Sequence, residues 1–149
     1  MVLSLSPSGG GAHAHLGLTL MQKGDAPAAL AEIEQEKAEI WRMIALPMAY
    51  CALRRKADAD AARDALIAKY EKDWSYNIAH VYTFCGDADI AFEWLDKAVA
   101  YQDSGLAETT SESLFDKIHP DPRWLPFLRK IGKAPDQLAR IEFKMPPLP

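Results

Sequence analysis

The sequence lacks both a long apolar run and an excess of basic residues. No segment reaches the roughly 20 consecutive apolar residues that a bilayer-spanning helix needs. The chain of 149 residues holds 17 Lys and Arg against 21 Asp and Glu, for a net charge of −4. Such a balance gives no electrostatic attraction to nucleic acid or to anionic lipid. We therefore expect neither nucleic acid nor a membrane among the partners.

Cysteine is scarce as well. Cys51 and Cys85 are the only two, too few for a framework of disulfides, which favours a reducing compartment. The first five residues hold no basic segment, and their apolar stretch is too short for a signal peptide. We therefore expect a cytoplasmic location, with each cysteine a free, small apolar side chain on a helix face.

Signals for β-strands are nearly absent, and what remains indicates helices. Alanine and leucine are the commonest residues, and apolar residues recur at three- and four-residue spacing. The predicted fold class is all-α. The pattern predicts six helices, near 12–23, 27–39, 41–54, 57–70, 74–85 and 88–101.

Two segments of the chain share one pattern. A small residue is followed after seven positions by a Gly-Asp turn, then by an alanine and a large apolar residue. The members are Gly17, Gly24, Ala29 and Ile33 in the first segment, and Ala79, Gly86, Ala91 and Leu95 in the second. Small side chains let two helices approach closely, and glycine suits the left-handed residue that ends a helix. Asp25 and Asp87 are the expected N-caps of the helices that follow.

This pattern resembles the tetratricopeptide repeat, whose small and large residues recur with a period of 34. The resemblance implies a right-handed superhelix of antiparallel helix pairs. A middle repeat fits less well: its turn is expected at Arg54 instead of glycine, and Pro47 stands where a small residue belongs. Ala59 matches, whereas Arg63 replaces the large apolar residue, and Leu66 is expected to take over its packing role.

The spacing of this repeat pattern divides the chain into four parts. Residues 1–11 are expected to be the end of a truncated preceding repeat and a linker, and residues 12–101 three helix pairs. Residues 102–143 are expected to form a helical cap and 144–149 a Pro-rich tail. The cap should contain a short helix around Phe115, a helix that starts at Asp121-Pro122, and a last one near 135–143. Two segments, Ala91-Phe92-Glu93-Trp94-Leu95-x-x-Ala98 and Asp121-Pro122-Arg123-Trp124-x-x-x-Leu128, resemble the C-terminal repeats of bacterial winged-helix or nucleotide-cyclase regulators. This resemblance implies a fragment of a larger regulatory protein.

The candidate catalytic residues have simpler structural explanations. His13 and His15 would face away from each other on a helix, so we expect no metal site. A Cys–His nucleophile that uses His80 lacks an orienting third group, and His119 and Asp121 fit a loop and a helix start. We expect no enzyme, no metal and no cofactor. The alternative is a hydrolase built on Cys–His or Asp–His.

In the repeats that the chain resembles, the first helix of each pair lines a concave groove that holds a peptide. Nine groove residues are expected on this basis: Ala14, Leu18, Met21, Ile44, Met48, Cys51, Tyr76, His80 and Thr83. They predict a scaffold that binds an apolar protein or peptide segment. The alternatives are that these residues contact only neighbouring helices, that the chain forms a homo-oligomer, or that it regulates an absent catalytic or DNA-binding domain in cis.

Overall fold

The computed structural model describes residues 10–111 and 113–142, and within these ranges every regular element is a helix. The all-α prediction is therefore confirmed for the described chain. The expected end of a preceding repeat lies outside the described residues except for its last two, and the Pro-rich tail lies wholly outside them. No described helix is long and apolar enough to cross a bilayer.

Six α-helices follow one another as three helical hairpins. Their bounds are α2 Ala12–Gln22, α3 Ala26–Glu34, α4 Glu39–Ala52, α5 Lys56–Tyr70, α6 Ser75–Cys85 and α7 Ala88–Tyr101. These agree with the predicted bounds to within two residues, except at the end of α3. Helix α4 continues on both sides of Pro47, although proline removes one backbone hydrogen bond from a helix.

Helix α3 ends five residues before the predicted position because Glu36 turns inward. Its carboxylate accepts hydrogen bonds from the backbone amides of His13 and Ala14 at the start of α2, and from that of Ala38. These amides lie at or beside helix N-termini, where backbone donors lack intrahelical partners. Burial opposes the charged form, yet the amide hydrogen bonds outweigh it and lower the pKa of Glu36.

The same turn closes all three hairpins. The residue that leaves the first helix is left-handed in each, with φ of 84° at Gly24, 58° at Arg54 and 93° at Gly86. The amide of the next residue then bonds back across the turn at 2.9 Å in each case, to the carbonyl of Leu20, Tyr50 or Tyr82. This is the hydrogen bond of a Schellman motif. The turn position predicted for Arg54 is therefore confirmed, although the residue is not glycine.

Small side chains sit where the helices of a hairpin meet. Ala29, Ala79 and Ala91 are fully buried. A Cβ added to Gly17 would lie 2.5 Å from the Cγ1 of Ile33 and 3.2 Å from the carbonyl oxygen of Ala29. The first hairpin therefore has no room for a side chain at Gly17.

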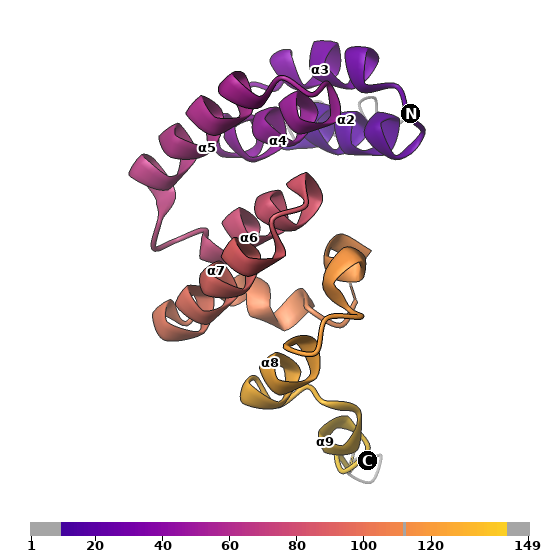
Figure 1. Ribbon diagram of the computed structural model, residues 1–149, viewed down its shortest axis with the longest axis vertical. Helices are drawn as coiled ribbons and strands as arrows, with labels where there is room; N and C mark the ends of the chain where they lie inside the picture. Colours follow the sequence, from indigo (N-terminus) through magenta and orange to yellow (C-terminus); the bar gives the residue numbers. More distant parts are fainter. Residues whose placement is uncertain (1–9, 112, 143–149) are drawn as a thin grey trace, which may run out of the picture.

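The three hairpins are arranged so that their first helices form a row. Helix α4 packs against α2 on one side and α6 on the other, and α3, α5 and α7 pack against the first helix of their own hairpins. Figure 1 shows α2 to α5 together at one end of the molecule, with α6 and α7 below them. The row α2–α4–α6 defines the face on which the predicted groove should lie.

The remaining chain forms a helical region that covers the third hairpin. It contains two 3₁₀ helices, η1 Ser104–Glu108 and η2 Ser113–Ile118, followed by α8 Trp124–Lys130 and α9 Pro135–Leu138. Both 3₁₀ helices pack against α6, and the ion pairs Arg123–Asp89 and Lys130–Asp96 join α8 and the turn before it to α7. In Figure 1, α8 and α9 continue the molecule away from α2 to α5.

Candidate binding groove

A cavity of about 260 Å³ lies on the face formed by the three first helices. Three of its lining residues, Leu18, Met48 and His80, were predicted as groove residues, and they come from α2, α4 and α6 in turn. The rest of the lining is Gln22, Phe84, Ser113, Leu114, Asp116 and Lys117. The cavity therefore joins all three hairpins to the 3₁₀ helix η2.

The other predicted groove residues do not line this cavity. They share deep burial or a covalent bond: Ala14, Met21, Ile44, Tyr76 and Thr83 are buried, and Cys51 is part of a disulfide. The physical reason is that the helices approach closely enough for most inward-facing positions to pack against their neighbours. Most of the expected groove surface is therefore core. Leu18, Met48 and His80 line this cavity, whereas Cys51 and Tyr76 line other hollows of the surface.

The protein's own chain occupies the groove face of α6. Phe115 of η2 is fully buried, and its ring centroid lies 5.1 Å from that of Tyr76 and 6.1 Å from that of His80. A Cβ at Gly105 in η1 would lie 2.5 Å from the Tyr76 ring, so the close approach of η1 requires a glycine. Helix α6 is therefore covered over much of the face that was predicted to bind a partner.

His80 forms part of the cavity wall as an uncharged side chain. Burial, together with a smaller contribution from the nearby positive charge of Lys117, lowers the pKa of His80 to about 4. At neutral pH the imidazole is therefore neutral, with one nitrogen as a donor and the other as an acceptor. Thr83, one turn along α6, donates its hydroxyl to the carbonyl of Ala79. The polar group that this wall presents is thus a neutral ring.

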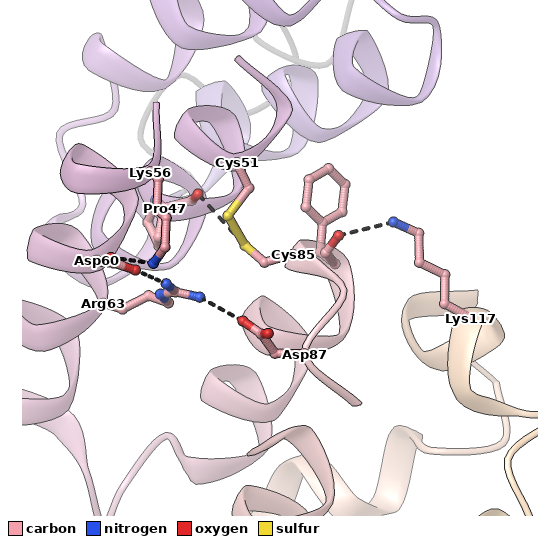
Figure 2. The surroundings of a disulfide bond; sticks show 9 residues. Pro47, Cys51, Lys56, Asp60, Arg63, Cys85, Asp87 and Lys117 are labelled. Carbon is pink, nitrogen blue, oxygen red and sulfur yellow. Dashed lines mark hydrogen bonds and ion pairs between the residues drawn. A yellow bond between two sulfur atoms is a disulfide. The ribbon is translucent and has the colours of Figure 1, made fainter. Parts of the chain in front are cut away.

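Lys117 holds η2 against the end of α6 at the edge of the cavity. Its ammonium group donates to the carbonyl of Phe84 at 2.9 Å and lies 4.8 Å from the centre of the Phe84 ring. Figure 2 shows this lysine reaching from η2 toward α6. The C-terminal end of a helix carries free carbonyl groups, which a lysine ammonium satisfies well. Lys117 and Leu114 were not predicted as site residues, because their position depends on how the chain returns to α6.

The two cysteines form a disulfide, which corrects the prediction of free thiols. Cys51 near the end of α4 and Cys85 at the end of α6 are joined, with their Cα atoms 5.5 Å apart (Figure 2). Their separation of 34 residues equals the period of the repeat that the chain resembles, and the pairing arises from the packing of α4 on α6. Disulfides persist in oxidising compartments, so cysteine usage no longer favours a cytoplasmic location.

The disulfide lines a second cavity, of about 340 Å³. The remaining lining residues are Arg54, Lys56, Ala59, Arg63 and Asp87. Arg63 is buried, pairs with Asp60 and Asp87, and lies with its guanidinium 4.9 Å from the centre of the Tyr82 ring. Asp87 therefore binds Arg63 instead of capping α7, whereas Asp25 accepts the amide of Ala28 as predicted.

The residues of the alternative hydrolase are engaged elsewhere. A disulfide leaves neither cysteine as a thiolate, so the Cys–His arrangement is wrong for this state of the chain. Arg123 binds Asp121 and lowers the pKa of its carboxyl group to about 2, while His119 lies 3.5 Å from Asp116. His13 pairs with Glu32 at 2.8 Å. Within the described ranges, no group of three His, Cys, Asp or Glu side chains is placed to hold a metal ion.

The chain was compared with protein families, curated proteins and solved structures. No protein-family model matches the chain, and neither a curated protein nor a solved structure matches it.

Proposed function

We propose that this chain is a tetratricopeptide-type module that binds a protein partner through an apolar side chain placed in the Leu18–Met48–His80 cavity. The single observation that carries the proposal is that the first helix of every hairpin contributes to the lining of this cavity. The recurrence of one turn geometry in the three hairpins supports the repeat assignment. A superhelical stack presents such a surface without any catalytic group.

The chemistry of the cavity indicates what the partner inserts. Leucine, methionine and phenylalanine side chains supply apolar contact, and methionine adapts its shape to different ligands. His80 adds one neutral polar group, and Asp116 and Lys117 place one charge of each sign among the lining residues. A single leucine or phenylalanine side chain buried here would contribute about 1.5–3 kcal/mol. We therefore propose a segment with one apolar anchor and a neutral hydrogen-bonding group beside it.

Peptide selection followed by a matched pair of variants tests this function. Random peptides displayed on phage are selected on the wild-type chain, and affinities are then measured for Leu18→Glu and Leu16→Glu. Leu18 lines the cavity, whereas Leu16 is 37% exposed on the same helix and does not line it. We expect Leu18→Glu to weaken the selected peptides about tenfold or more, equivalent to about 1.4 kcal/mol, and Leu16→Glu to bind them as the wild type does. Equal affinities for both variants would reject the cavity as the binding site.

A further inference from the structure

The cavity beside the disulfide lies apart from the proposed peptide site and shares no residue with it. Both cysteines belong to its lining and both are only partly buried, so a small molecule in the cavity would lie against the disulfide. Thiol–disulfide exchange requires a thiolate to reach one sulfur of the bond. The position of this disulfide meets that requirement.

The cavity also carries an excess of positive charge. Its lining holds three cationic side chains, Arg54, Lys56 and Arg63, and one anionic side chain, Asp87. Asp60 pairs with both Lys56 and Arg63, which reduces the excess without removing it. Arg54 forms no ion pair with any residue that the structure describes. One guanidinium is thus available to an anion that enters the cavity.

Arg54 stands in a conformation that arginine rarely adopts. Its φ of 58° is left-handed, like those of Gly24 and Gly86 at the two equivalent turns. Glycine adopts this conformation without steric cost, whereas a residue with a Cβ does not. Strained residues of this kind tend to occur at functional sites. Among the three hairpin turns, the strained one is therefore the turn at Arg54, beside the cavity that holds the disulfide.

We propose that this cavity is a reduction site, which binds a low-molecular-weight thiol carrying carboxylate groups and directs its thiolate to the Cys51–Cys85 bond. Arg54 and Lys56 pair with the carboxylates. Opposite charges in a partly enclosed cavity raise the local concentration of an anion and its rate of association. A neutral thiol gains no such advantage, and a cationic thiol is repelled.

The exchange proceeds in two balanced steps. The bound thiolate attacks one cysteine sulfur, the bond between the two cysteines breaks, and the other cysteine leaves as a thiolate. The nearby cations stabilise that leaving thiolate. A second thiol molecule, as its thiolate, then attacks the mixed disulfide and releases the first cysteine. Two external thiols are oxidised to one external disulfide, and the protein disulfide gains two electrons and two protons.

Reduction would release the covalent tie between the second and third hairpins. The disulfide joins α4 to α6, and these helices also supply Met48 and His80 to the peptide cavity. The redox state of Cys51 and Cys85 would thereby control how firmly the two walls of that cavity are held together.

Reduction rates with thiols of different charge test the proposal. Oxidised protein is mixed with excess glutathione, 2-mercaptoethanol or cysteamine, quenched with iodoacetamide at intervals and analysed by mass spectrometry. Rates are corrected for the thiolate fraction of each reagent. We expect the wild type to react with anionic glutathione at least about fivefold faster than with cationic cysteamine, and this ratio to fall as the salt concentration rises. Equal corrected rates would overturn the proposal, as would two free thiols in air-purified protein.

Variants then locate the effect. Arg54→Asn with Lys56→Gln removes two charges from the cavity, and asparagine tolerates the left-handed conformation. The matched control is Lys23→Gln with Lys72→Gln, which removes two exposed charges that do not line the cavity. We expect the ratio of the glutathione rate to the 2-mercaptoethanol rate to fall severalfold in the first variant alone. The ratio cancels any general change in disulfide stability, so an unchanged ratio in that variant would overturn the proposed docking site.

Discussion

The middle hairpin, α4–α5, and the two hairpins beside it adopt the same turn with different residues. Gly24 and Gly86 take the left-handed position without strain, whereas Arg54 takes it with a side chain. The bond back across the turn measures 2.9 Å in all three hairpins. The geometry of the turn is therefore fixed by how the two helices pack, and the residue at the turn adapts to it.

The three hairpins also differ in the residue that packs the second helix against the first. Nine residues after the turn, the outer hairpins place Ile33 and Leu95, both fully buried, and the middle hairpin places Arg63. The charge of Arg63 is tolerated because Asp60, Asp87 and the Tyr82 ring surround it. Burial of an unpaired charge would be costly. A position that is apolar in the outer hairpins thus accepts a cation in the middle one, where Asp60 on the same helix and Asp87 of the third hairpin pair with it.

The largest effects should come from the apolar residues that pack each second helix. Leu66 in the middle hairpin and Leu95 in the third are both fully buried. We expect Leu66→Ala and Leu95→Ala each to lower the free energy of unfolding by about 2–5 kcal/mol, measured by urea titration. Similar values would show that Leu66 replaces the packing lost at Arg63. A loss below about 1 kcal/mol for Leu66→Ala alone would show that the middle hairpin is packed loosely.

The disulfide should contribute nearly as much, since it joins the middle hairpin to the third. Its cysteines are 34 residues apart, and closing a loop of this length lowers the entropy of the unfolded chain by the equivalent of about 3–4 kcal/mol. We expect the double variant Cys51→Ser, Cys85→Ser to lose about this amount relative to the oxidised protein in urea. The reduced wild type serves as the control and should match the variant. A difference below about 1 kcal/mol would mean that the helix contacts alone hold the two hairpins in place.

The sequence predicted the hairpins well because each depends on residues close together in the chain. The sequence pattern of residues 12–101 predicted six helices, and the structure confirms their bounds apart from the end of α3. That exception arises from Glu36, whose carboxylate turns inward to accept hydrogen bonds from three backbone amides.

The site was predicted less well because it depends on contacts between distant segments. Leu18, Met48 and His80 line one cavity, but Phe115 covers the face of α6 beside them. The pairing of Cys51 with Cys85 likewise depends on how α4 and α6 cross. A sequence shows which residues face a neighbouring helix, but it does not show the distance at which that helix lies.

The first and third hairpins differ in how closely their two helices approach. Gly17 and Ala79 occupy equivalent positions, yet a Cβ at Gly17 would lie 2.5 Å from Ile33. We expect Gly17→Ala to destabilise the protein by about 1–3 kcal/mol through overpacking, by thermal or urea unfolding. The reverse change, Ala79→Gly, should cost no more than about 1 kcal/mol, the value for Gly in a helix interior. A neutral Gly17→Ala variant would mean that α2 and α3 are no closer together than α6 and α7.

The smallest effects should separate the backbone strain at Arg54 from any role of its side chain. Gly24 has no atom within 4 Å of an added Cβ, so Gly24→Ala tests the left-handed backbone alone. We expect Gly24→Ala to destabilise the protein by about 1 kcal/mol. The opposite change, Arg54→Gly, should stabilise it by up to about 1 kcal/mol, because it removes the same strain. Differential scanning calorimetry of both variants checks this symmetry. A destabilised Arg54→Gly variant would mean that the arginine side chain contributes more to the fold than its backbone conformation costs.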